Sequence, residues 1–409
     1  MNDFFKFVEN GSITTPQGFR ACGVTAGLKA SGKADMALIF SEIPANFAGA
    51  FTSCLFAAAP VQVDRKRVLD SKFVQAIIVN SGNANACTGR IGLENAEKTC
   101  QMTAQKMGLT PDAVMVSSTG RIGVQLNMAK IAKGIELAAA ALSNDGGSDA
   151  ARAIMTTDTV PKTAAVTFTI DGKPVSIGAM TKGAGMISPK MVLPHATMLC
   201  YITTDARIEN SLLAKMLGIG VDLSFNRITI DNDMSTNDSC IIMANGKSGI
   251  TIQQNSTNAE LFQQALSALL KKLAVAMVKD GEGATKLVNI EIHGAASRVD
   301  AEKAAKAVAN SMLCKTAWFG GDPNWGRVAA ALGYSGAIFE PEKVDVYYNS
   351  KPVIKKGQDA GTPEKELAAE MAGREFTIKC NLNAGSVDYN VWTSDLSYEY
   401  VKINAEYTT

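Results

Sequence analysis

Apolar and polar positions along the chain follow two periods, which predict strands and helices in turn. Residues 76–80 (AIIVN) form a short apolar run typical of a buried strand, and residues 113–118 (AVMVSS) predict another. Between them, residues 94–107 have a helical pattern that Gly108 closes as a C-terminal cap. The Ala-rich segment 127–142 predicts a further helix. The N-terminal part of the chain therefore alternates strand and helix.

Hairpin signals appear in the middle of the chain. Residues 163–170 and 175–180 alternate around Asp171-Gly172, which predicts a β-hairpin. Hairpins and a strand-rich C-terminal half favour a mixed sheet between helices over a purely parallel doubly wound fold. The other predicted elements are strands at 198–203, 288–293, 343–348, 375–381 and 398–403, and helices at 210–217 (capped by Asp205), 259–277 and 301–312.

Charge is balanced, with 40 Lys and Arg against 39 Asp and Glu, a net charge of +1. This balance argues against nucleic acid or an anionic membrane surface as a partner. The 409 residues are 46% apolar, enough for two or three domains or for one large layered α/β domain with an appendage. We see no apolar stretch long enough to span a membrane and no secretory signal pattern at the N-terminus. We therefore expect a cytoplasmic protein.

Histidine is rare, since His195 and His293 are the only two in the sequence. Serine–histidine and cysteine–histidine catalysis each need a positioned imidazole, and multi-histidine metal sites need several. The eight cysteines form no C-x-x-C pair, so we expect reduced, mostly buried thiols rather than disulfides or a zinc site. An enzyme of this composition needs another general base, and we expect no metal ion and no cofactor.

A threonine at the start of an apolar strand could supply that base. Thr197 follows the small residue Ala196, after a Gly-rich segment, and its hydroxyl could attack the carbonyl of Ala196 without a bulky side chain in the way. Hydrolysis of the resulting ester would leave an α-amine on Thr197, whose ordinary pKa of roughly 8 suits a base for the hydroxyl of the same residue. Threonine is also common at strand starts for structural reasons, so the pattern alone leaves both interpretations open.

Three further loops carry polar groups that could serve such a site. Thr119-Gly120 offers a hydroxyl beside an unobstructed backbone N–H, a pair that could hold an oxyanion. Glu282 stands between two glycines and could pair with a substrate ammonium group. The run GGDPNWGR precedes a helix and could bind an anion, although we favour Trp325 as a packing anchor. Each loop also has a plain structural interpretation, as a turn or a solvated helix end.

Several sequence blocks along the chain resemble, in their order, those of the ornithine acetyltransferases, also called glutamate N-acetyltransferases, of arginine biosynthesis. The resemblance covers nearly the whole chain. It implies the αββα sandwich shared with self-processing aminopeptidases, a mixed α/β (α+β) fold, with a smaller C-terminal α/β subdomain at about 286–409. The blocks are NSGNANACTGRIGLENA, SSTGRIG, MTTDTVPK, KGAGMI, ATMLCYITTDA, DGEGATK, GGDPNWGR and a tail that contains Asn and ends in Thr.

The resemblance also implies a cleavage and an assembly. The precursor would cut itself between Ala196 and Thr197 into an α chain (1–196) and a β chain (197–409), which would assemble as an α2β2 heterotetramer. A four-residue insertion, 192–195, departs from the family pattern KGxGMIxPxMATML directly before the scissile bond. It could bulge outward or slow the cleavage. His195 could assist, but we favour a plain inserted loop.

The implied reaction is a ping-pong acyl transfer in arginine biosynthesis. The acetyl group passes from N2-acetyl-L-ornithine to Thr197 as an ester and then to L-glutamate, and use of acetyl-CoA as a further donor stays open. Thr119 and Gly120 would form the oxyanion hole. The positions that match substrate-binding residues are Thr156, Lys182, Thr197, Glu282, Asn404 and Thr409. We expect Lys182 to suit the α-carboxylate of both substrates and Glu282 the δ-ammonium of ornithine.

Two other functions are kept as alternatives. With water in place of glutamate as the acceptor, the same site would make an N-terminal-nucleophile aminopeptidase or amidase. An uncleaved chain that binds an amino acid without catalysis is the second alternative. A nucleotide-binding function has little support, because no GxGxxG or phosphate-binding lysine loop occurs at a strand–helix junction.

Overall fold

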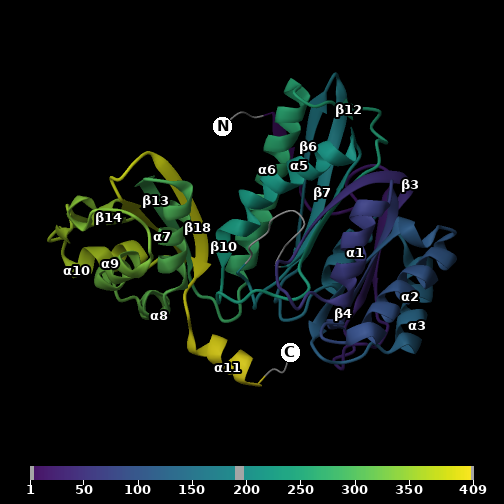
Figure 1. The fold of residues 1–409 in the computed structure, drawn as a ribbon, viewed down its shortest axis with the longest axis horizontal. Coiled ribbons are helices and arrows are strands. Elements are labelled where there is room, and N and C mark those ends of the chain that lie inside the picture. Colours follow the sequence, from purple (N-terminus) through teal and green to yellow (C-terminus); the bar gives the residue numbers. More distant parts are fainter. Residues whose placement is uncertain (1–3, 189–197, 407–409) are drawn as a thin grey trace.

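A computed structural model describes residues 4–188 and 198–406, and in them helices and strands form a sandwich of four layers with a smaller α/β unit beside it (Figure 1). The larger sheet runs in the order β1-β6-β7-β8-β11-β3-β4-β5, and β2 also pairs with β3. Its strands are β1 (Phe5–Phe7), β2 (Phe19–Val24), β3 (Met36–Phe51), β4 (Val74–Asn83), β5 (Val114–Arg121), β6 (Lys162–Ile170), β7 (Lys173–Lys182), β8 (Leu199–Thr204) and β11 (Ser239–Ala244).

The long strand β3 divides this sheet into two layers. Its first half pairs with β2 and β4, and its second half pairs with β11, with an irregularity in the β3–β4 register between Phe40 and Ala45. A register irregularity of this kind bends a strand and increases its twist. One strand can therefore contribute to both layers of the sandwich.

Side chains of each layer alternate between an inner and an outer core. On β11, Ile241 and Met243 face the second layer, whereas Cys240 and Ile242 face the helices outside. The same alternation holds on β4, where Ile77 packs inward and the next residue packs outward. Because both faces are buried, these strands have continuous apolar sequences rather than alternating ones.

Helices cover the two outer faces. On one side lie α5 (Asn210–Asp222) and α6 (Thr257–Lys279), and on the other lie α1 (Ala59–Asp70), α2 (Gly89–Met107) and α3 (Met128–Ala141). Helix α6 is the one described helix long and apolar enough to cross a membrane by length and composition. Its apolar face packs on β6 and β7, so it is a core helix of the sandwich.

The smaller unit has its own sheet and core. The sheet runs β10-β18-β13-β17-β14-β15-β16, and buried residues such as Ile290, Val308 and Trp318 fill the space under its helices. Trp325 packs against the same core, in agreement with its interpretation as a packing anchor. The elements are β10 (Ile228–Thr229), β13 (Leu287–Ala295), β14 (Asp345–Tyr348), β15 (Lys351–Lys355), β16 (Gln358–Asp359), β17 (Glu375–Asn381), β18 (Val387–Ser394), α7 (Arg298–Asn310), α8 (Met312–Gly320), α9 (Trp325–Tyr334) and α10 (Glu364–Met371).

The predicted αββα sandwich is confirmed, while two local predictions are wrong. The segment 398–403, predicted as a strand, is helical in α11 (Tyr398–Glu406), because Ser397 accepts a hydrogen bond from the amide of Tyr400 and caps the helix start. Asp205 does not cap α5, since Glu209 precedes that helix. The Asp205 carboxylate instead accepts hydrogen bonds from the amides of Gln17 and Ser176.

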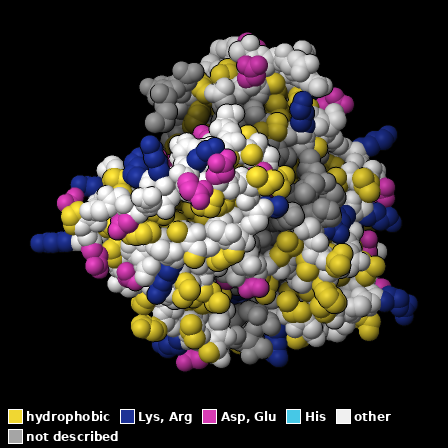
Figure 2. All heavy atoms as spheres, turned by 60° about the vertical axis from the view of Figure 1, so that its left-hand side comes forward, with side chains coloured by type: hydrophobic (Ala, Val, Ile, Leu, Met, Phe, Trp, Pro, Cys, Tyr) yellow, Lys and Arg dark blue, Asp and Glu magenta, His cyan; other side chains and the backbone are white. Residues whose placement is uncertain are grey.

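Three smaller elements, one helix and two short strands, also belong to the sandwich. Helix α4 (Gly147–Ala153) lies against β2, and the short strands β9 (Arg207–Ile208) and β12 (Thr251–Ile252) pair with each other. Charged side chains of both signs are interspersed over the face shown in Figure 2, in agreement with the balanced net charge.

Candidate active site

One pocket lies where several strand ends and loops of the sandwich meet. Strand β5 ends there with Thr119, β7 ends with Lys182, and Met198 precedes β8. The loop before β11 and the segment after α6 complete the wall. The described predicted site residues that line this pocket are Thr119, Gly120, Thr156, Lys182, Glu282 and Asn404.

The Thr119-Gly120 corner depends on close packing of two strands. In the parallel pair β4–β5, Gly120 lies opposite Gly82. Gly120 has a φ of +127°, and a Cβ there would lie 2.5 Å from the carbonyl carbon of Gly82. Any side chain at this position would both strain the backbone and clash with β4. The strand end therefore holds the Thr119 hydroxyl beside an unobstructed backbone.

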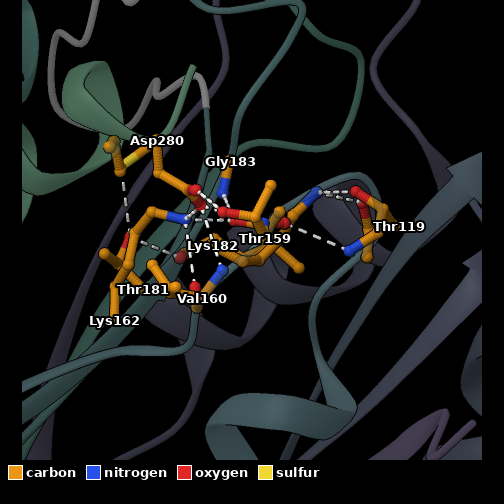
Figure 3. Close-up of polar contacts among 12 residues, drawn as sticks. Thr119, Thr159, Val160, Lys162, Thr181, Lys182, Gly183 and Asp280 are labelled. Carbon is orange, nitrogen blue, oxygen red and sulfur yellow. Dashed lines mark hydrogen bonds and ion pairs between the residues drawn. The ribbon is translucent and has the colours of Figure 1, made fainter. Parts of the chain in front are cut away.

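Lys182 is the central cation of the pocket. Its ammonium Nζ donates to Thr119 Oγ1 at 3.1 Å and to Thr156 Oγ1 at 2.8 Å (Figure 3). Burial lowers the pKa of Lys182, and nearby Asp158, Asp238 and Glu282 only partly oppose this effect. A buried ammonium group that is fixed by two hydroxyls can bind a negatively charged group of a ligand.

A buried carboxylate fixes the strand end that carries Lys182. Asp158 accepts hydrogen bonds from Lys162 Nζ at 2.6 Å, from the amide of Gly183 at 2.7 Å and from the amide of Thr156 at 3.1 Å. Burial alone would raise the pKa of Asp158, but Lys182 and Lys162 outweigh it, and the net shift is downward. The charged carboxylate thereby ties the 156–160 segment to β7.

Asp280 extends this network on the other side of Lys162. It accepts from Lys162 Nζ at 2.5 Å and from the amide and hydroxyl of Thr159 (Figure 3). The paired carboxylates of Asp158 and Asp280 thus compensate the buried charge of Lys162. Since Lys162 is fully occupied by these partners, it holds the wall of the pocket together rather than facing a ligand.

Glu282 reaches the pocket because two glycines leave room for it. A Cβ on Gly185 would lie 2.4 Å from Glu282 Oε2, and a Cβ on Gly283, where φ is +66°, would lie 2.5 Å from the amide nitrogen of Tyr400. The amide of Glu282 donates to the carbonyl of Ala184 at 2.8 Å. The segment is therefore packed between the β7 loop and α11, and is not a freely solvated helix end.

Asn404 joins the pocket from the far end of the chain. Its side-chain amide donates to Glu282 Oε2 at 2.8 Å and to the carbonyl of Tyr400 at 3.0 Å. Helix α11 extends away from the smaller unit toward the sandwich (Figure 1). The helix thereby brings a C-terminal residue to a carboxylate that lies 122 positions earlier in the chain.

Asn237 and Asp238 also line the pocket, although no motif in the sequence marks them as site residues. The amide group of Asn237 donates to the carbonyls of Ala84 and Ser118 at 2.5 and 2.8 Å, which ties the loop before β11 to β5. Burial raises the pKa of Asp238 strongly against the opposing effects of Ser235 and Lys182, and its Oδ2 has no hydrogen-bond partner within the described residues. In the sequence, these two residues belong to a polar run directly before the apolar strand β11, and this run is the signal that could have indicated them.

Four predicted features lie outside the described residues. These are Ala196, Thr197, the 192–195 insertion and Thr409. The cleavage at Ala196–Thr197, the division into α and β chains and the nucleophile therefore stay predictions. Met198, the next residue along the chain, lines the pocket.

Comparisons with known proteins agree with the sequence resemblance. The model of the ArgJ family matches residues 20–409. The "Arginine biosynthesis bifunctional protein ArgJ" of Symbiobacterium thermophilum is 46% identical over 402 residues, which is 98% of this chain and 99% of that protein. The "Glutamate N-acetyltransferase" of Methanocaldococcus jannaschii is 44% identical over 411 residues, 98% of this chain and all of that protein.

A solved structure is also similar to part of the chain. The ornithine acetyltransferase of Mycobacterium tuberculosis, in complex with ornithine, is 38% identical, with coverage of 46% of this chain and all of that one and a TM-score of 0.42. The family match spans almost the whole sequence, and the relatives match over nearly their full lengths. The chain belongs to the ArgJ family.

Proposed function

We propose that this protein is a glutamate N-acetyltransferase that moves an acetyl group from N2-acetyl-L-ornithine to L-glutamate. The observation that carries this proposal is the convergence of residues from distant segments on one pocket beside Met198. Relatives with 44–46% identity over nearly their full length carry the names of this activity and of arginine biosynthesis. We also propose a cytoplasmic α2β2 assembly.

The first half-reaction forms an acetyl ester on Thr197. After cleavage of the bond to Ala196, the free α-amine of Thr197 takes the proton of its own hydroxyl, and Oγ1 attacks the amide carbonyl of acetylornithine. The same amine then passes the proton to the departing ornithine nitrogen. No histidine takes part, which suits a chain with only two histidines.

Lys182 orients the two hydroxyls that it contacts, so that each can donate a hydrogen bond to a ligand. An ammonium group can only donate, so the oxygens of Thr119 and Thr156 accept from it, and their own protons are free to point toward a ligand. The Thr119 hydroxyl and the Gly120 amide then stabilise the tetrahedral oxyanion. Loss of one such donor typically costs roughly 3–4 kcal/mol of barrier.

The substrate ends are recognised by opposite charges. Lys182 attracts the α-carboxylate that acetylornithine and glutamate share, while Glu282 pairs with the δ-ammonium of ornithine. Asn404 orients the Glu282 carboxylate through its 2.8 Å hydrogen bond. In the second half-reaction, the amine of glutamate attacks the ester and restores the hydroxyl of Thr197.

The decisive experiment compares acceptors and follows the cleavage. The purified protein is incubated with acetylornithine, with and without glutamate, and intact mass spectrometry identifies the chains. We expect acetylglutamate only when glutamate is present, and a β chain that begins at Thr197. Equal acetate release in both reactions would instead favour the amidase, and an unbroken inactive chain would favour the non-catalytic alternative.

A variant tests the nucleophile directly. Thr197→Val keeps the size and β-branching of the side chain but removes the hydroxyl, so we expect neither cleavage nor transfer. Normal turnover by this variant would show that Thr197 does not carry the acetyl group.

A further inference from the structure

Self-cleavage needs a base that the acyl transfer does not supply. In the transfer, the α-amine of Thr197 takes the proton of its own hydroxyl, but before cleavage the same nitrogen belongs to the peptide bond to Ala196. A peptide nitrogen is not a base, because resonance delocalises its lone pair into the carbonyl group. Another group must therefore accept the hydroxyl proton when Oγ1 of Thr197 attacks the carbonyl of Ala196.

Three of the described residues that line the acyl-transfer pocket have titratable side chains, namely Lys182, Glu282 and Asp238. The ammonium group of Lys182 donates to two hydroxyls, and Glu282 accepts a hydrogen bond from Asn404. Oδ2 of Asp238 is buried and has no hydrogen-bond partner within residues 4–188 and 198–406. Such an oxygen is uncommon in folded proteins, and it is free to accept a proton from a reacting group.

The backbone around Asp238 is fixed on both sides. The carbonyl of Asp238 accepts a hydrogen bond from the amide of Thr52 at 3.0 Å, directly after the end of β3. The amide of the next residue, Ser239, donates to the carbonyl of Met198 at 2.6 Å. The side chain, only 2% exposed, is therefore held in one place in the pocket wall.

Asp238 lies beside the start of β8. Strands β8 and β11 are parallel with Leu199 opposite Ser239, so one residue earlier on each strand Met198 is level with Asp238. Neighbouring strands lie about 4.8 Å apart, and consecutive Cα atoms lie about 3.8 Å apart. Since Thr197 directly precedes Met198 in the sequence, the chain bond keeps the Cα of Thr197 within one residue of this level.

We infer that the carboxylate of Asp238 is the general base of the self-cleavage, which takes the hydroxyl proton of Thr197 while Oγ1 attacks the carbonyl of Ala196. The inference rests on the proposed function, because it requires cleavage before Thr197. It assigns the two stages to different bases. Asp238 acts once in each chain, and the α-amine that this step creates acts in every later acetyl transfer.

The surroundings of Asp238 suit a proton acceptor. Burial raises the pKa of Asp238, while Ser235 and Lys182 favour its charged form. A carboxylate with a raised pKa takes a proton from a hydroxyl more readily than an exposed carboxylate does. The resulting carboxylic acid can then return the proton to the departing nitrogen.

The reaction balances with water as the one further reactant. Asp238 takes the hydroxyl proton, Oγ1 of Thr197 bonds to the carbonyl carbon of Ala196, and the bond from that carbon to the Thr197 nitrogen breaks. The proton passes from Asp238 to this nitrogen, which becomes the α-amine. Water then hydrolyses the ester, so that its hydroxide part joins Ala196 and its proton restores the hydroxyl of Thr197.

The rate of self-cleavage tests the inference. The full-length chain is made by pulse-labelled cell-free translation, and denaturing gels follow the conversion of the 43.1 kDa precursor into two smaller chains. Asp238→Asn keeps the shape of the side chain but is not a base, so we expect cleavage to be slower by about 100-fold or more. Cleavage of this variant within threefold of the wild-type rate overturns the inference.

Chemical rescue distinguishes a base from a structural support. Asp238→Ala leaves room for a small carboxylate, so we expect formate to speed its cleavage at least tenfold more than the same concentration of potassium chloride does. Equal effects of the two salts overturn the inference. Circular dichroism checks the fold of both variants, and either folded variant is sufficient for the decision.

Two further variants provide the controls. Asp233→Asn removes an exposed carboxylate of the same loop that does not line the pocket, and it should cleave at the wild-type rate. His195→Gln removes a rival base two positions before Thr197 in the sequence, and we expect this variant to cleave. Loss of cleavage in either control, with normal cleavage in Asp238→Asn, overturns the assignment to Asp238.

The outcomes separate the two proposals. A wild-type chain that is not cut before Thr197 contradicts the proposed function. A wild-type chain and an Asp238→Asn chain that are cut at the same rate overturn the role of Asp238 alone.

Discussion

Two buried lysines in different parts of the molecule make an instructive comparison. Lys182 ends β7 in the pocket, and Lys315 lies on α8 under the smaller sheet, where its ammonium contacts Thr393 and Ser394 of β18. Burial lowers the pKa of both, and that of Lys315 falls to about 7. Neither forms a direct ion pair within the described residues. A buried, perturbed cation alone therefore does not distinguish a functional site.

The surroundings of the two lysines do differ. Around Lys182, residues from β5, β7, the 156–160 segment and the loops after α6 and before β11 converge on an open pocket. Around Lys315, the contacts come from one strand, with Thr393 Oγ1 at 2.9 Å, and close a helix onto a sheet. We infer a functional role where separate elements converge on a space for a ligand, and a structural role where they fill it.

The largest expected effect is that of a substitution at Lys182, which tests its functional role. Lys182→Met removes the cation that aligns the hydroxyls of Thr119 and Thr156, so kcat/KM for acetylornithine should fall by about 10²–10³. Steady-state kinetics on folded protein, checked by circular dichroism, measures this. Activity within fivefold of wild type would contradict the assigned role of Lys182.

Lys315→Met should act on stability rather than on activity. The folded-state pKa of about 7 lies below the ordinary 10.5, so between these pH values the unfolded chain holds a proton that the folded protein lacks. The stability of the wild type therefore rises with pH across this window and is lower below it. In the wild type, the free energy of unfolding should rise by roughly 3 kcal/mol between pH 7 and pH 10. In the variant, this rise should be absent.

Urea unfolding at several pH values measures this difference. The expected kinetics of Lys315→Met at pH 8 are within twofold of wild type. The comparison of the two lysines fails if the variant and the wild type show the same pH dependence of unfolding, or if the variant loses transferase activity while folded.

Glu282→Gln sharpens the assignment of substrate ends. The variant keeps a hydrogen-bond partner for Asn404 but loses the charge, so KM for acetylornithine should rise about tenfold, or about 1.4 kcal/mol, while KM for glutamate stays within twofold. Glu399→Gln, an exposed carboxylate on α11 beside Lys402, is the control and should leave both values unchanged. Equal changes for both substrates would exclude a contact specific to ornithine.

The smallest effect concerns the attachment of α11. Ser397 Oγ donates to the carbonyl of Gly283 at 2.7 Å and accepts from the amide of Tyr400, so it joins the helix start to the Glu282 loop. Ser397→Ala should cost about 1 kcal/mol at this cap and raise KM for acetylornithine two- to fivefold.

A second cap provides the control for that variant. Ser297→Ala removes the N-cap of α7, where the Ser297 hydroxyl accepts from the amide of Asp300. It should lower stability by a similar amount without a change in KM. If both variants change KM equally, α11 does not position Glu282.

Much of the fold could be predicted from local patterns. The apolar runs at 76–80 and 113–118 are β4 and β5, the hairpin around Asp171-Gly172 is β6–β7, and Gly108 caps α2 in the left-handed conformation with a φ of +69°. These features depend on residues close in sequence, so periodicity and turn chemistry suffice to locate them. The segment 398–403 is an exception. Its alternating apolar and polar residues predict a strand, but the Ser397 cap starts a helix there.

The site was predicted through motif blocks rather than through geometry. Thr119 and Glu282 are indicated by the glycines beside them, and Lys182 only by the family pattern around it. Asp238 carries no such signal, because its significance arises from burial near Lys182. Its place beside β8 follows from a parallel pairing in which Ser239 lies opposite Leu199, 40 positions earlier. No local pattern specifies such a pairing.

The sequence by itself determined the elements, the glycine-dependent turns and the candidate chemistry without histidine, because these depend on side chains within a few residues of each other. Tertiary structure alone decided that β3 serves two layers and that α11 brings Asn404 to Glu282. The physical reason is that these contacts depend on which distant segments pack into the same buried core. The sequence of one segment specifies its local conformation but not its distant partners.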